Sequence, residues 1–223
     1  MINFKKIIYK LNPFFYNYLR LWYFKKKKLP KEFIRQINKL NKNHIVIDLG
    51  ANIGLITEIL AKTKAKVFSF EPNSKAYNSL RDIELKYSNV KAYKAAAGYK
   101  NCKTKLYHHN NYNVSNEDLT QASSLKSGKE NISEFNFEEV EEIDFSNFLF
   151  DINDQIELIK IDIEGYEIEL LNHLLDTGSI NKLNKIFLET HDVKNPSLKK
   201  DTDKLKTRIK NAGLEHKFFY EWH

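Results

Sequence analysis

Residues 45–54 read IVIDLGANIG, an apolar run of β-branched residues that passes into a turn with two glycines. Such a run predicts a buried strand over residues 45–49, and the sequence that follows predicts a helix over residues 55–62. Gly50 permits a tight turn and the close approach of a ligand, whereas Gly54 lets the helix pack near the strand. This unit of strand, turn and helix therefore directs the free amides of a helix start toward a crevice.

Strands and helices continue to alternate after this unit. Further strands are predicted at residues 66–70, 90–95, 157–161 and 185–189, and further helices at residues 74–86 and 166–175. Gly178 is placed to cap the last of these helices. This alternation predicts parallel strands joined by right-handed crossovers, that is, an open α/β sheet with helices on both faces. Ligands of such sheets bind at the carboxyl ends of the strands.

The length of 223 residues and the 42% of hydrophobic residues predict one globular domain with a short additional segment. We assign residues 1–43 to a basic, aromatic-rich helical arm and residues 44–223 to the domain. The single cysteine, Cys102, excludes an internal disulfide framework and fits a reducing cytoplasm. We expect neither a membrane-spanning helix nor a cleavable signal peptide, because no apolar stretch has the required length or cleavage site.

The positive charge is concentrated in the arm. Residues 1–43 hold ten lysines and two arginines against one acidic residue, a net charge of +11, so the rest of the chain carries −4. An acidic body argues against a nucleic-acid partner. Aromatic residues interleaved with lysines in residues 1–30 favour peripheral contact with the inner face of a membrane, and the alternative is a helix packed on the domain. Pro30 is predicted to start a helix over residues 31–40.

Residues 99–142 break the alternation because they are polar and longer than an ordinary connection. They include possible strands at residues 106–109 and 140–143. One interpretation is a hairpin and a loop over the site. The alternative is a disordered surface insertion over residues 110–137.

Two acidic residues at strand ends indicate a nucleoside site. Asp48 precedes Gly50, Asn52 lies within the turn, and the third glycine of a dinucleotide-binding turn is missing. A carboxylate there repels a pyrophosphate but suits a cationic ligand such as S-adenosylmethionine. Glu71 follows Gly50 by 21 residues, the spacing at which a carboxylate accepts hydrogen bonds from a ribose diol, and Pro72 fixes the turn after it. The alternative for Glu71 is a solvated acid at a strand end.

Four further side chains lie at the ends of two later strands. Residues 158–167 read LIKIDIEGYE and residues 186–191 read IFLETH, which places Asp162, Glu164, Glu189 and His191 together if these strands are neighbours. Such a group can deprotonate an acceptor hydroxyl, or Asp162, Glu189 and His191 can hold a divalent metal ion. Alternatively, Glu164 caps its helix and His191 is a structural loop histidine.

In this order and spacing, the segments DLGANIG (48–54), EPN (71–73), KIDIEGYE (160–167) and ETH (189–191) resemble FkbM-type S-adenosylmethionine-dependent methyltransferases. The resemblance covers about residues 44–192, and the segments 123–125 and 140–149 are similar to the middle of that family. It implies a class I methyltransferase (Rossmann-like) three-layer sandwich, mostly parallel, with a last antiparallel strand that residues 215–220 could supply. It also implies O-methylation of a sugar or polyketide hydroxyl.

The main hypothesis is an S-adenosylmethionine-dependent O-methyltransferase that acts on a sugar in a glycan or glycolipid. The residues expected to bind the cofactor are Asp48, Gly50, Ala51, Asn52, Gly54, Glu71, Pro72 and Asn73. Asp162, Glu164, Glu189 and His191 are the expected catalytic residues. One alternative is an NAD-dependent oxidoreductase, against which the missing glycine and Asp48 count. The other is a non-catalytic protein of the membrane surface, supported only by the arm.

Overall fold

The structure, a computed structural model, describes residues 29–109, 123–125, 132–193 and 195–220. It divides the chain into two units, residues 1–39 and residues 40–223, and each is described by itself. Most of the predicted membrane-contacting arm and most of residues 110–137 lie outside the described residues. In the first unit, helix α3 (Lys31–Ile37) begins directly after Pro30, as predicted, but ends three residues earlier than expected.

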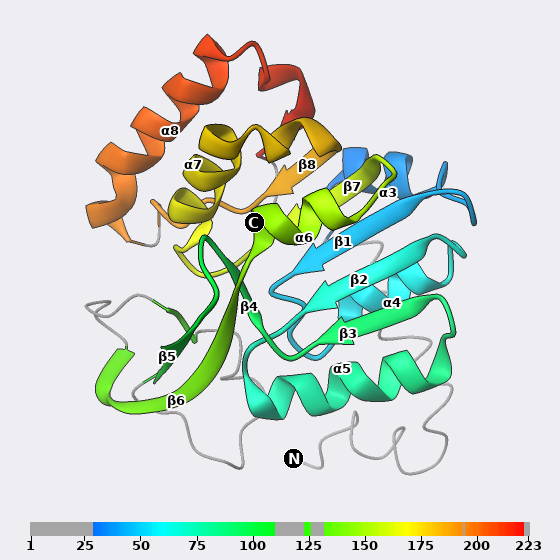
Figure 1. The fold of residues 1–223 in the computed structure, drawn as a ribbon, viewed down its shortest axis with the longest axis horizontal. Coiled ribbons are helices and arrows are strands. Elements are labelled where there is room, and N and C mark those ends of the chain that lie inside the picture. Colours follow the sequence, from blue (N-terminus) through cyan, green and yellow to red (C-terminus); the bar gives the residue numbers. More distant parts are fainter. Residues whose placement is uncertain (1–28, 110–122, 126–131, 194, 221–223) are drawn as a thin grey trace, which may run out of the picture. The chain divides into compact units, whose positions relative to one another are not determined.

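The second unit is built on a parallel sheet with the strand order β3-β2-β1-β7-β8-β9 (Figure 1). The strands are β1 (Ile45–Leu49), β2 (Lys66–Phe70), β3 (Val90–Tyr93), β7 (Ile156–Ile161), β8 (Leu183–Leu188) and β9 (Phe218–Phe219). The chain builds outward from β1 through β2 to β3 and then returns to place β7 on the other side of β1. The order therefore reverses between β1 and β7, where a ligand crevice forms at the carboxyl ends of the strands.

Helices cover both faces of this sheet, which confirms the predicted three layers. Helices α6 (Phe145–Asp151), α7 (Glu167–Thr177) and α8 (Lys199–Asn211) share one apolar core with the alternate strand residues Ile47 and Phe70. The intervening strand residues point to the opposite face, where Ser69 contacts Thr57 of helix α4 (Leu55–Ala61). Helix α5 (Ser74–Lys86) packs on that second face through Leu80, which joins Ala92 of β3.

The last strand corrects one expectation. Residues 215–220 were expected to add an antiparallel strand, but β9 pairs in parallel with β8, Ile186 opposite Phe218 and Phe187 opposite Phe219. Helix α8 lies between β8 and β9 in the chain, and a crossover that contains a helix is the connection that parallel strands need. The rings of Phe187 and Phe219 stack with centroids 4.7 Å apart.

A second, smaller sheet has the order β4-β6-β5 and consists of β4 (Ala96–Gly98), β5 (Cys102–His109) and β6 (Ile132–Asp144). Strands β5 and β6 are antiparallel, as a hairpin requires, and they contain both short strands predicted within residues 99–142. Ser124 forms an isolated bridge with Tyr107 of β5. The described parts of the segment 99–142 therefore form strands beside the main sheet. The choice between a loop and a disordered insertion at residues 110–122 and 126–131 lies outside the described residues.

Candidate functional site

The turn between β1 and α4, residues 50–54, is the glycine turn. Three of its residues have left-handed backbone conformations: Gly50 (φ 69°), Asn52 (φ 50°) and Gly54 (φ 82°). A Cβ atom on Gly50 would lie 1.8 Å from the carbonyl oxygen of Asp162, so the close approach that requires glycine is made by the chain after β7 and not by a ligand. A Cβ on Gly54 would meet Ile83 of α5 at 2.3 Å, so this glycine lets two helices approach, not a helix and a strand.

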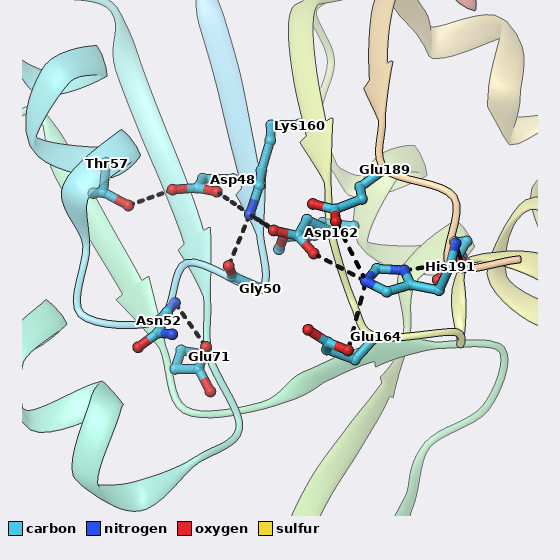
Figure 2. Close-up of polar contacts among 12 residues, drawn as sticks. Asp48, Gly50, Asn52, Thr57, Glu71, Lys160, Asp162, Glu164, Glu189 and His191 are labelled. Carbon is cyan, nitrogen blue, oxygen red and sulfur yellow. Dashed lines mark hydrogen bonds and ion pairs between the residues drawn. The ribbon is translucent and has the colours of Figure 1, made fainter. Parts of the chain in front are cut away.

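Glu71, at the end of β2, is tied to the glycine turn. Its Oε2 accepts a hydrogen bond from the Asn52 amide at 2.7 Å (Figure 2). Its Oε1 accepts one from the Asn73 amide at 2.8 Å. Burial raises the pKa of Glu71 to about 7, although these two amides and the charge of Lys160 act in the opposite direction. The carboxylate therefore lies beside the glycine turn, and its contact with a ribose stays a prediction.

The other residues predicted around Glu71 support the turn from inside the protein. Ala51 is buried against Leu80 and donates its amide to the Phe70 carbonyl. Asn73 is fully buried, and its Oδ1 caps α5 by accepting from the amides of residues 75 and 76. Pro72 is only partly buried. Of these three residues, the side chains of Ala51 and Asn73 serve the fold.

Asp48 occupies a different position from the one predicted. Its side chain is fully buried on the face that α4 covers, and its Oδ2 accepts a hydrogen bond of 2.7 Å from Thr57. Its Oδ1 lies 3.5 Å from the ammonium nitrogen of Lys160. The expectation that Asp48 presents its charge to a cationic ligand is wrong for this structure, because the charge is enclosed and already balanced.

Lys160 was not among the predicted site residues, yet it lies at the junction of the two halves of the site. Its Nζ donates to the Gly50 carbonyl at 2.8 Å and to the Leu49 carbonyl at 3.2 Å. It also lies 3.4 Å from Oδ2 of Asp162 (Figure 2). The signal available in the sequence was a lysine between Ile159 and Ile161 near the end of a predicted strand. Its register with Asp48 of the neighbouring strand is visible only in the structure.

The cluster predicted from the later strands is assembled around His191. Its Nε2 lies 3.5 Å from Glu164 Oε2, 3.6 Å from Asp162 Oδ1 and 3.8 Å from Glu189 Oε1 (Figure 2). The histidine is 1% exposed, whereas the side chains of Asp162 and Glu164 are 27% and 25% exposed. The two acids therefore form the accessible edge of the cluster, and His191 forms its floor.

Glu167, another residue that the sequence did not single out, orients the imidazole. Its Oε1 lies 3.2 Å from His191 Nδ1 and accepts the His191 amide, while its Oε2 accepts the Gly165 amide at 2.8 Å. Burial lowers the pKa of His191, but the carboxylates of Glu164 and Glu167 outweigh this effect and raise it to about 10. A carboxylate on Nδ1 directs Nε2 toward the other three acids, the arrangement of a metal-ligating histidine.

The smaller sheet contacts both sides of this edge. Ser124 donates to the backbone carbonyl of Glu164 at 2.8 Å, and Glu164 has a left-handed backbone (φ 55°). On the other side, the Glu138 carboxylate of β6 accepts hydrogen bonds from the amide and hydroxyl of Ser74, at the start of α5. His108 lies 3.6 Å from the same carboxylate. The predicted hairpin segment therefore contacts the site. Ser124 belongs to the segment 123–125 that the family resemblance singled out, whereas Glu138 and His108 were not identified from the sequence.

Comparison with known proteins identifies a family that the chain matches over most of its length. The model of the methyltransferase FkbM domain matches residues 48–215, a span that includes the glycine turn, Glu71 and the His191 cluster. No curated protein matches the chain. Among solved structures, the crystal structure of precorrin-6y C5,15-methyltransferase from Geobacter metallireducens GS-15 is similar with a TM-score of 0.38 and 14% identity. That match covers 82% of this chain and 74% of the other.

Proposed function

Because the chain belongs to the FkbM methyltransferase family, we propose that it transfers a methyl group from S-adenosylmethionine to a hydroxyl group of a sugar in a glycan or glycolipid. The observation that supports the acceptor is the accessible pair of acids, Asp162 and Glu164, directly across from the glycine turn. Carboxylates are good acceptors for the hydroxyl hydrogen bonds of a sugar, and one of them can take the proton that the acceptor loses.

The residues on the β2 side fit the cofactor. Each oxygen of Glu71 accepts one backbone amide, which leaves a further lone pair on each for the two ribose hydroxyls. When bound, S-adenosylmethionine supplies a methyl group on a positively charged sulfur. The protein then has to align the acceptor oxygen with that methyl group and remove one proton.

The His191 cluster fits a divalent metal ion. Within the described residues, Nε2 of His191 is buried without a hydrogen-bond partner, and one ligand atom each of Asp162, Glu164 and His191 lies within 4.8 Å of the others. The sequence suggested Asp162, Glu189 and His191, so the geometry adds Glu164 and leaves Glu189 as a neighbour. An oxygen-rich set with one imidazole suits Mg²⁺ or Mn²⁺, which lowers the pKa of a bound hydroxyl.

The test is methyl transfer from labelled S-adenosylmethionine into separated polysaccharide, lipid and small-molecule fractions of the host, with and without a chelator. We expect label in a sugar-containing fraction and its loss with the chelator. Asp162→Asn should lower transfer by about 10²–10⁴-fold, as loss of a general base does. Asp82→Asn, an exposed acid of α5, is the control and should not change transfer. Label confined to fractions without sugar would contradict the proposed acceptor, and activity that survives the chelator would contradict the metal.

A further inference from the structure

The ammonium group of Lys160 is enclosed by oxygen atoms from both halves of the site. The residue is 3% exposed. Its Nζ contacts the carbonyls of Leu49 and Gly50 and the carboxylates of Asp48 and Asp162, all at 2.8–3.5 Å (Figure 2). Three of these groups belong to the end of β1 and the residue after it, and Asp162 follows β7. One cation therefore connects the ends of the two strands at which the sheet order reverses.

The sheet dictates this position. Asp48 and Lys160 are register partners on neighbouring parallel strands, and both side chains lie on the face that α4 covers. Burial lowers the pKa of Lys160, but the charges of Asp162 and Asp48 outweigh burial, so its pKa lies above the ordinary value. The side chain is therefore a buried cation, and a buried cation is stable only where paired groups surround it.

We propose that Lys160 is a positioning residue that fixes the glycine turn to Asp162, with Asp48 as its buried counter-charge. This role rests on the proposed function, in which the turn borders the cofactor and Asp162 borders the acceptor. Because Gly50 has no side chain, the Asp162 backbone lies directly against it. Lys160 bridges the same two residues through a hydrogen bond to the Gly50 carbonyl and an ion pair with the Asp162 carboxylate. Methyl transfer depends on such a fixed separation, since a misplacement of 1 Å can cost about 100-fold in rate.

Backbone amide exchange of the ligand-free protein, measured by NMR, tests this proposal without an acceptor. The amides of Gly50 and Ala51 both donate to the Phe70 carbonyl. Their exchange rates therefore measure how often the glycine turn opens. Lys160→Met leaves Asp48 buried and unpaired, so the decisive variant is Asp48→Asn/Lys160→Met, which removes both charges. We expect the Gly50 and Ala51 amides to exchange at least about tenfold faster in this double variant. The exchange rate of the Ile47 amide, in the middle of β1, should change only as much as the free energy of unfolding of the whole domain changes.

Thr57→Val is the matched control. It removes the hydrogen bond that Thr57 donates to Oδ2 of Asp48, the oxygen that does not face Lys160. The contacts of Lys160 with Leu49, Gly50, Asp48 and Asp162 stay in place. It should lower global stability without selectively speeding exchange at Gly50 and Ala51. Unchanged protection of these two amides in the double variant, or equal acceleration in Thr57→Val, would overturn the role of Lys160.

Titration with S-adenosylhomocysteine separates this proposal from the proposed function. We expect the wild type to bind it and the double variant to bind at least about tenfold more weakly, because the turn beside the ligand is no longer held in its bound position. If the wild type does not bind, the proposed function fails, while the exchange data still decide the role of Lys160. If both proteins bind equally, the turn does not depend on Lys160 and the proposal is wrong.

Discussion

At the scale of single residues, the site separates side chains that serve the fold from those that face the crevice. Asp48 and Asn73 have polar groups suited to ligand binding, but both are fully buried and engaged by their own protein. Asp162 and Glu164 are partly exposed beside the same turn. The charge that faces the crevice therefore comes from the end of β7 and not from the end of β1.

Gly50→Ala tests the contact between the glycine turn and Asp162. The variant adds a Cβ atom at a positive φ and 1.8 Å from the Asp162 backbone oxygen. Relief of this overlap requires a shift of the backbone, which costs free energy. Gly213→Ala is the matched control, because it has nearly the same φ (+70°) and no atom within 4 Å. Strain alone should cost the control about 1–2 kcal/mol. Gly50→Ala should cost about 1–3 kcal/mol more in urea unfolding, and equal costs would contradict the contact.

Glu71 provides a test by pH. Burial raises its pKa from 4.5 to about 7, so the folded protein holds this proton more tightly than the unfolded chain does. Its contribution to stability is therefore complete below pH 4.5 and is lost as the pH rises to 7. The free energy of unfolding of the wild type, minus that of Glu71→Gln, should fall by about 2–3 kcal/mol between pH 5 and pH 8. A difference that does not change with pH would show that Glu71 is not buried in this way.

At the scale of elements, strong periodic patterns and the parallel pairing of the main strands were predicted well, whereas the direction of the last strand was not. Strands β1 and β2 and helix α5 have the predicted bounds, because apolar runs and an Asn73 cap are local signals. The predicted direction of β9 was wrong. A strand of only two phenylalanines does not indicate the direction in which the preceding crossover brings the chain back to the sheet.

The candidate site shows the same division. The grouping of Asp162, Glu164, Glu189 and His191 was predictable because parallel strands end at one edge of the sheet. Lys160 and Glu167 were missed, because their roles depend on partners contributed by other strands and loops. Asp48 was misplaced, since a sequence does not show which strand residues face a covering helix.

We predict that the contact between Glu138 and Ser74 holds the smaller sheet in place. Glu138 connects β6 to the start of α5 through Ser74, and its neighbour Glu139 is exposed on the opposite face of the same strand. Glu138→Ala should speed hydrogen exchange in β5 and β6, measured by mass spectrometry, and leave β1 and β7 protected. Glu139→Ala should change neither region. Equal behaviour of the two variants would show that the Ser74 contact does not hold the smaller sheet.

At the scale of the whole molecule, the charge distribution separates the arm from the catalytic domain. The body carries the acidic cluster, whereas the net charge of +11 lies in residues 1–43. Among the residues that the structure describes, no helix combines the length and the apolar character needed to cross a bilayer. Contact between residues 1–30 and the inner face of a membrane remains a prediction from the sequence.

Vesicle flotation checks this prediction. The full chain should float with vesicles that contain anionic lipid and not with neutral vesicles, because each lysine near an anionic surface contributes about 1 kcal/mol. Replacing Lys25 through Lys28 with glutamine should reduce flotation, whereas the same number of changes at the exposed lysines 91, 103, 200 and 210 should not. Equal loss in both variants would mean that the arm has no special role.

The most direct test of the site is isothermal titration calorimetry with S-adenosylhomocysteine. The wild type and the control Asp82→Asn should bind one equivalent with the same affinity. Glu71→Ala, which removes the carboxylate assigned to the ribose, should bind at least about tenfold more weakly, a change of about 1.4 kcal/mol. Absence of binding by the wild type, or unchanged affinity in Glu71→Ala, would contradict a nucleoside site at the carboxyl ends of β1 and β2.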